Sequence, residues 1–145
     1  MAVYFCHMAS AANFPHHAIP CDDDFALAAL VEKGIPVQMF RGLSAKLNLA
    51  PTVLAVMVGF APRTAARRLS GNARLKPTET ERTVRIARLL YKAEDLFGGR
   101  EEASAWFNGP LDAFNGKSPL EMCRTEPGAR AVEQTLGRIE HGVFS

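Results

Sequence analysis

Basic side chains concentrate between residues 62 and 92 of this 145-residue chain. That segment has nine Lys or Arg residues and two acids, a net charge of +7, whereas the whole chain carries only +2. Guanidinium and ammonium groups donate hydrogen bonds to phosphate oxygens and to base edges. A stabilising solvated helix face would instead alternate opposite charges. We interpret the segment as a surface for a polyanion, with nucleic acid as the expected partner.

The basic segment begins inside a pattern typical of a helix-turn-helix. Residues 51–58 form an apolar helix pattern, and Gly59 can take the positive φ of a tight turn. Pro62 suits the first turn of a second helix. On that helix, Ala65 and Leu69 lie four residues apart and are expected to face the first helix. The second helix is therefore the predicted recognition helix.

The candidate DNA contacts follow from position along this helix. A recognition helix places its N-terminal residues against base edges in the major groove, so Arg63, Thr64 and Arg67 are the expected base readers. Arg68 is expected to contact phosphate or a base, and Arg74 to contact phosphate. The full candidate set is Arg63, Thr64, Arg67, Arg68, Arg74 and Lys76. An ordinary solvated helix face is the alternative, disfavoured because acidic partners are few.

The rest of the chain shows helix patterns and no strand pattern, so the expected fold class is all-α. Further helices are predicted over residues 22–32, 37–47, 78–97, 101–107, 120–123 and 129–141. Thr78 with Glu81 resembles a capping box, and Ser118 with Pro119 forms a helix start. The expected division is a flexible tail at 1–21, a helix-turn-helix domain at 22–77, a central helix at 78–98 and a C-terminal bundle at 99–145.

The central helix carries apolar residues on more than one face, so it must be buried against two neighbours. A second copy of the chain is a natural second neighbour, and we predict a homodimer. The candidate dimerisation residues are Val84, Ala87, Leu90 and Tyr91. A core helix in a monomer is the alternative.

No catalytic, cofactor or metal site is expected, because the chain has no glycine-rich phosphate loop and no nucleophile motif. Potential metal ligands at Cys6, His7, His16, His17 and Cys21 lack the usual Cys-x-x-Cys spacing. The apolar runs are too short to span a bilayer, and the N-terminus lacks a secretory pattern. Three unpatterned cysteines are typical of a reducing compartment, so a cytoplasmic protein is expected.

The C-terminal part has the opposite charge. From residue 101 onward it carries seven acids and four bases, a net charge of −3, which suits DNA poorly. This part also contains a short helix before W-x-N at 106–108, an L-x-x-x-x-G-x-S-P pattern at 111–119 and a last helix with a glycine-containing tail. Residues 97–145 closely resemble the toxin-binding domain of Xre/MbcA/ParS-type antitoxins. Residues 58–71 resemble the helix-turn-helix of the same family.

The resemblance implies a type II antitoxin that represses its own operon and neutralises a RES-domain toxin. Such a toxin degrades NAD or uses it for ADP-ribosyl transfer. In this family the C-terminal domain covers the toxin's NAD cleft, and the middle helix forms the dimer. The motif positions expected mainly to specify the fold are Trp106, Asn108, Pro110, Leu111, Gly116, Ser118 and Pro119.

The expected toxin contacts lie on or after the last helix. They are Arg130, Glu133, Arg138, Glu140, Val143, Phe144 and Ser145. Phe144 is apolar at a chain end, so it is expected either to insert into the toxin or to fold back on its own domain. The alternatives to an antitoxin are a stand-alone dimeric transcription regulator and an RNA-binding scaffold. The scaffold is disfavoured because aromatics do not alternate with the basic residues.

Overall fold

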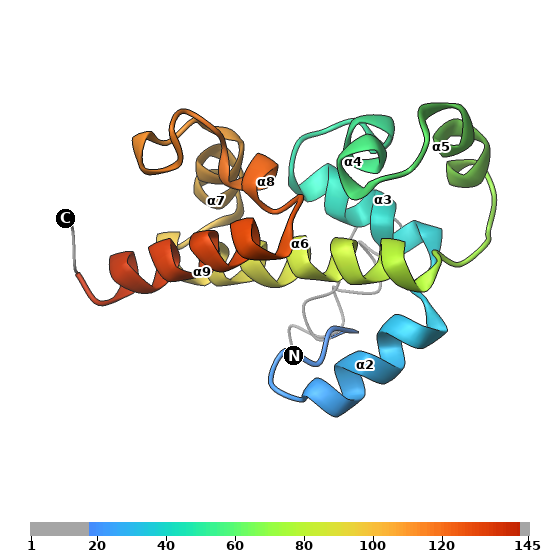
Figure 1. Cartoon of the computed structure of the whole chain (residues 1–145), viewed down its shortest axis with the longest axis horizontal. Coiled ribbons are helices and arrows are strands. Elements are labelled where there is room, and N and C mark those ends of the chain that lie inside the picture. The colour runs from blue at the N-terminus through green and yellow to red at the C-terminus, as the bar shows by residue number, and fades with distance from the viewer. Residues whose placement is uncertain (1–17, 143–145) are drawn as a thin grey trace. The chain divides into compact units, whose positions relative to one another are not determined.

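Helices and their connections account for the regular structure of residues 18–142, the part of the chain that the computed structural model describes (Figure 1). Within these residues there is no strand, only an isolated antiparallel bridge between Pro36 and Arg74. The all-α prediction is confirmed. The chain divides into two compact units, Met1–Val84 and Arg85–Ser145, and helix α6 (Pro77–Phe97) contains the boundary.

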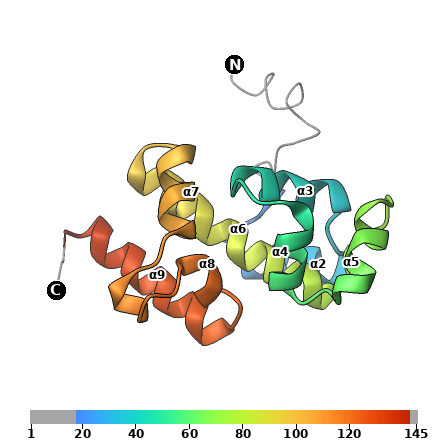
Figure 2. The ribbon, with the colours of Figure 1, turned by 90° about the horizontal axis from the view of Figure 1, so that it is seen from above.

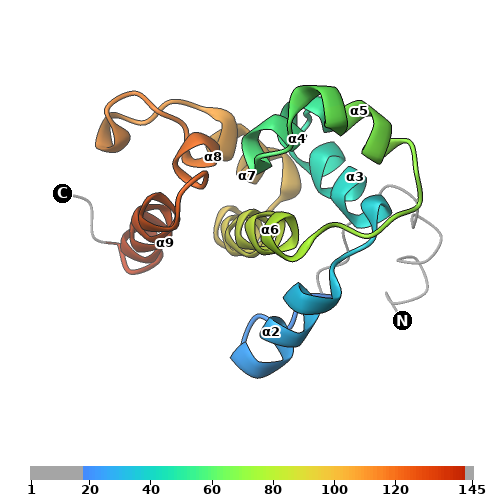
Figure 3. The ribbon, with the colours of Figure 1, turned by 45° about the vertical axis from the view of Figure 1, so that its right-hand side comes forward.

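The first unit contains α2 (Asp24–Lys33), α3 (Val37–Lys46), α4 (Pro51–Val58), α5 (Pro62–Leu69) and the start of α6. Helices α3, α4 and α5 pack against one another (Figure 2). The rings of Phe40 from α3 and Phe60 from the α4–α5 turn stack with centroids 5.5 Å apart, and both side chains are buried. Helix α2 lies across α6 from these three helices and has no buried residue (Figures 1 and 3).

Helix α6 begins at Pro77, one residue before the predicted start, so the predicted capping box of Thr78 with Glu81 is wrong. The backbone N–H of Lys76 donates to Oε1 of Glu79 at 2.9 Å, and the N–H of Thr80 donates to the Lys76 carbonyl at 2.8 Å. Glu79 therefore has the capping role predicted for Glu81. Proline suits the first helical position because that position needs no amide donor.

The second unit contains the rest of α6, then α7 (Arg100–Asn108), the 3₁₀ turn η3 (Asp112–Phe114), α8 (Pro119–Met122) and α9 (Glu126–Glu140). Helix α8 packs against both α7 and α9. The predicted start of α9 at residue 129 is wrong by one turn. Thr125 caps the helix by accepting the N–H of Gly128 at 3.1 Å, and Pro127 lies in the first turn.

The motif residues of the second unit build its turns. Ser118 and Glu121 form a complete capping box at α8, as predicted for Ser118, with N–H to side-chain distances of 3.1 and 3.0 Å. The Leu111 carbonyl accepts the N–H of Gly116 at 2.9 Å, and Gly116 has φ +85°. Trp106 is partly exposed and lies 5.5 Å from the ring centroid of Phe97. These contacts are consistent with a fold-specifying role for the motif.

Within residues 18–142, no helix has both the length and the apolar character needed to cross a bilayer.

Candidate functional site

The helix-turn-helix forms at the predicted residues. Gly59 follows α4 with φ +102°, and the N–H of Phe60 donates to the Ala55 carbonyl at 2.8 Å. Helix α5 then begins at Pro62. Ala65 and Leu69 are 1% and 3% exposed, so their predicted inward orientation is confirmed. The predicted helix-turn-helix is present in this part of the chain.

The outward face of α5 presents two of the predicted base readers. Arg63 and Arg67 are exposed, and Thr64 is partly buried. Residues four apart on a helix lie on the same face, so the two guanidinium groups share one side of α5. The helix carries no acid, as its sequence PRTAARRL shows. This face can donate hydrogen bonds to phosphate oxygens or base edges.

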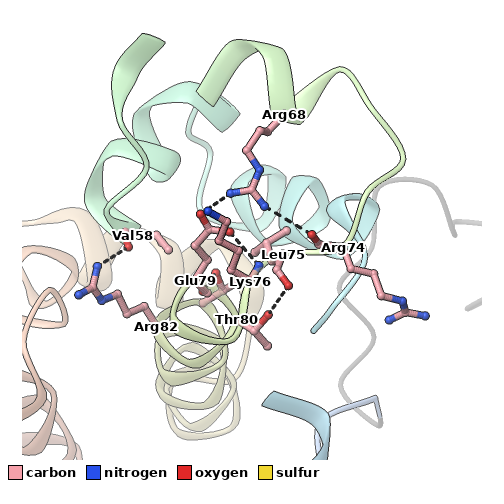
Figure 4. Close-up of polar contacts among 9 residues, drawn as sticks. Val58, Arg68, Arg74, Leu75, Lys76, Glu79, Thr80 and Arg82 are labelled. Carbon is pink, nitrogen blue, oxygen red and sulfur yellow. Dashed lines mark hydrogen bonds and ion pairs between the residues drawn. The ribbon is translucent and has the colours of Figure 1, made fainter. Parts of the chain in front are cut away.

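Arg68 has different surroundings from its neighbour Arg67. Its side chain is only 16% exposed and forms an ion pair with Glu79, which is 14% exposed. Its guanidinium carbon lies 5.0 Å from the ring centroid of Phe60. Its Nη2 donates to the Arg74 carbonyl at 3.4 Å, a contact drawn in Figure 4. The charge pattern predicts few acidic partners for the arginines. Arg68 nevertheless has one, because after the connection 70–76 the start of α6 places Glu79 beside it.

Three other arginines donate to carbonyl groups at helix ends. Arg82 Nη1 donates to Val58 of α4 at 3.0 Å, as Figure 4 also shows. Arg74 Nη1 donates at 2.7 Å to Gly34, which follows α2, and Arg41 donates to Leu69 of α5. Basic groups favour helix C-termini because the last carbonyls lack helical partners. Arg74 and Lys76, the predicted phosphate contacts, are both exposed residues.

The α9 candidates lie on the solvent side of that helix. Arg130, Glu133, Arg138 and Glu140 are exposed. The buried side of α9 consists of Gly128, Ala129, Val132 and Leu136. Arg130 and Glu126 form an ion pair at 2.6 Å, but their side chains are 62% and 57% exposed, so the pair contributes little stability. The remaining candidates, Val143, Phe144 and Ser145, lie outside the described residues.

The candidate dimerisation residues are buried in the single chain. Val84, Ala87, Leu90 and Tyr91 are each at most 2% exposed. The apolar faces of α6 thus already have neighbours within one chain, as the monomer alternative also requires. The homodimer stays a prediction.

Metal ligands and cysteine thiols are side chains that could provide a site of chemistry. Residues 18–142 contain no group of three or more His, Cys, Asp or Glu side chains that could hold a metal ion. Cys6, His7, His16 and His17 lie outside those residues. Burial raises the pKa of Cys123 from 9.0 to about 12, while the charge of Arg85 lowers it. The Cys123 thiol is therefore protonated at neutral pH and is a poor nucleophile.

We predict that Cys123 resists alkylation in the folded protein at mildly alkaline pH and reacts once the chain is unfolded. Because the folded pKa is about 12 and the unfolded value 9.0, burial of this thiol stabilises the fold fully only below pH 9. The free energy of unfolding should decrease as pH rises from there. Mass spectrometry after iodoacetamide treatment, with the denatured chain as control, measures the reactivity. Labelling of the native protein as fast as of the denatured chain would contradict the prediction.

Two domain families match the chain, one after the other, in approximately the same ranges as its two compact units. Residues 26–88 match the antitoxin Xre-like helix-turn-helix domain, and residues 92–142 match the antitoxin Xre/MbcA/ParS C-terminal toxin-binding domain. An antitoxin Xre from Yersinia enterocolitica is 30% identical over 128 residues, covering 88% of this chain and 86% of the relative. An antitoxin Xre from Photorhabdus laumondii is 31% identical over 82% of this chain and 81% of the relative. A Sphingobium protein named Prs ADP-ribosylating antitoxin is 24% identical over 80% of this chain and 79% of its own length.

Proposed function

The chain belongs to the Xre family of type II antitoxins, and from this premise we propose that it neutralises a RES-domain toxin and represses its own operon. The observation that carries the proposal is the presence of both domain matches in one chain, a helix-turn-helix followed by a toxin-binding domain. The name of the Sphingobium relative supports a toxin with ADP-ribosylating activity. We place the action of the protein in the cytoplasm, where its operator DNA would be.

The helix-turn-helix would deliver the complex to operator DNA. Arg63, Thr64 and Arg67 are the proposed base readers, since they lie on the first two turns of α5 and both arginines are exposed. Arg74 and Lys76 are the proposed phosphate contacts. A homodimer would present two recognition helices to a two-fold operator. Sedimentation that finds only monomer at micromolar concentration would remove the dimer from the proposal.

The C-terminal domain would hold the toxin. The exposed side of α9 carries charges of alternating sign at Arg130, Glu133, Arg138 and Glu140. Such a pattern favours a partner with complementary charges over non-specific binding. Val143, Phe144 and Ser145 would extend that interface toward the toxin's NAD cleft. The toxin holds the catalytic chemistry, and the antitoxin contributes only coverage of the cleft.

Deletion of residues 142–145 is predicted to weaken toxin neutralisation. An apolar side chain can fill a cleft on a partner protein, so losing Phe144 should remove part of the inhibitory contact. The measurement is the concentration of antitoxin needed to restore growth or to halt NAD loss. Unchanged neutralisation by the shortened chain would exclude insertion of the tail.

Substitution of a phosphate contact is predicted to weaken binding to all DNA sequences alike. Arg74→Ala or Lys76→Ala should each make the plot of log affinity against log salt shallower by about one unit, because one fewer counterion is released. Titration of operator and random duplexes at several salt concentrations measures this. A loss confined to the operator would show that these residues read sequence instead.

The proposed function is tested by capturing the tagged full chain from its native host and identifying what it binds. A RES-domain enzyme recovered in stoichiometric amount, together with the DNA upstream of the chain's own gene, would support both parts. Recovery of that DNA without any enzyme would instead support the stand-alone regulator.

A further inference from the structure

We infer that Arg68 is a positioning residue that orients the recognition helix, and that it does not itself contact DNA. The inference rests on the proposed DNA-binding function, which leaves Arg63 and Arg67 as base readers. Four side chains carry it: Arg41, Phe60, Arg68 and Glu79. We call them the α5 clamp, because they hold the C-terminal end of α5.

Arg68 is enclosed by its partners. Its guanidinium lies over the ring of Phe60, 5.0 Å from the centroid, and pairs with the carboxylate of Glu79. Phe60 is 4% exposed and stacks on Phe40 of α3. Through Phe60, Arg68 thus connects α5 to the core of the unit. Through Glu79, it connects α5 to the beginning of α6 (Figure 4).

Glu79 is itself fixed by the start of α6. Its Oε1 accepts a hydrogen bond from the N–H of Lys76 at 2.9 Å, and its Oε2 accepts one from Nη1 of Arg68. One carboxylate therefore caps α6 and holds α5. At the same end of α5, Arg41 donates to the carbonyl of Leu69.

Helix α5 needs such contacts. It has eight residues, and its N-cap residue Ala61 makes no side-chain capping bond. A helix of this length is unstable in water without tertiary contacts. The clamp therefore acts together with the buried Ala65 and Leu69 to fix the direction in which Arg63 and Arg67 project.

Contact between Arg68 and phosphate would require the clamp to open. The guanidinium would lose both its ring contact and its ion pair. Glu79 would keep only the N–H of Lys76 and would be left as a mostly buried carboxylate without a cationic partner beside a polyanion. The neighbouring Arg67 is exposed and meets no such obstacle. Adjacent arginines of the same helix thus have different roles.

The test uses the full chain, a duplex from its own promoter and a random duplex of equal length. The variants are Arg68→Ala, Glu79→Gln and, as the neighbouring control, Arg67→Ala. Arg68→Ala should weaken promoter binding roughly tenfold, leave the salt slope unchanged and speed amide hydrogen exchange in α5. Arg67→Ala should reduce the preference for the promoter over the random duplex and leave the exchange rates of α5 unchanged.

Glu79→Gln separates positioning from simple electrostatics by its sign. The glutamine oxygen can still cap Lys76, but the charge that holds Arg68 is lost. Positioning predicts weaker promoter binding although the protein becomes more positive, and tighter binding would overturn the inference. A salt slope made shallower by Arg68→Ala, with α5 exchange unchanged, would overturn it as well. A different result tests the proposed DNA-binding function itself: it fails if the unaltered chain shows no preference for its promoter. Failure of the Arg68 inference alone leaves that preference intact, so the two failures are distinguishable.

Discussion

Replacing both Arg63 and Arg67 by alanine is expected to abolish sequence-specific DNA binding and leave toxin neutralisation intact. Both side chains are exposed on the same face of α5. A good bidentate contact between arginine and a base contributes about 1–3 kcal/mol, so the double variant should lose on the order of 2–6 kcal/mol of operator affinity. Competition between operator and scrambled duplexes, followed by fluorescence anisotropy, measures that loss.

A charge-matched control separates base reading from a general loss of positive charge. Lys117→Ala with Arg124→Ala removes the same charge from exposed positions in the second unit and should leave operator preference unchanged. If Arg63→Ala with Arg67→Ala weakens operator and scrambled duplexes equally, the two arginines are phosphate contacts and not base readers.

Substitution of Gly128 by alanine is expected to disable the toxin-binding unit and to spare DNA binding. Gly128 is buried in the first turn of α9, where an added Cβ would overlap the Met122 carbonyl oxygen and lie 2.9 Å from Oγ1 of Thr125. The obstructing atom belongs to the backbone, so it cannot move aside by a change of rotamer. Overpacking of this kind costs about 1–3 kcal/mol of unfolding free energy, and α8 would have to shift relative to α9.

Gly137 supplies the control on the same helix. An added Cβ there meets nothing within 4 Å, so Gly137→Ala should stabilise α9 by about 0.5–1 kcal/mol. Chemical denaturation measures both variants, and toxin inhibition and operator binding are then compared. A Gly128→Ala protein that is as stable as the unaltered chain and neutralises toxin equally well would contradict the packing described for the α8–α9 junction.

The helix-turn-helix could be predicted because its determinants are local. The spacing of Ala65 and Leu69, the positive φ of Gly59 and the proline at the start of α5 all act within a few residues. The errors at Pro77 and Pro127 share one cause. In both places the sequence pattern predicts that proline ends a connection, whereas each proline lies in the first turn of its helix.

The α5 clamp could not be predicted from charge spacing. Arg68 and Glu79 are eleven residues apart, beyond the i,i+4 distance at which a helical sequence indicates an ion pair. The same limitation applies to Arg74 and Arg82, which donate to the distant carbonyls of Gly34 and Val58. The charges of Arg68 and Arg82 therefore serve the fold, whereas Arg74 bonds to Gly34 but is an exposed residue and stays a proposed phosphate contact.

The central claim, that this antitoxin inhibits a RES-domain toxin through its C-terminal domain, is tested most directly by titrating the purified toxin with the full chain and following NAD consumption. We predict that consumption falls to the background rate near the stoichiometric point. The Arg63→Ala, Arg67→Ala double variant should inhibit equally well, whereas Gly128→Ala should not. NAD consumption that continues unchanged in an excess of the folded chain would contradict the account.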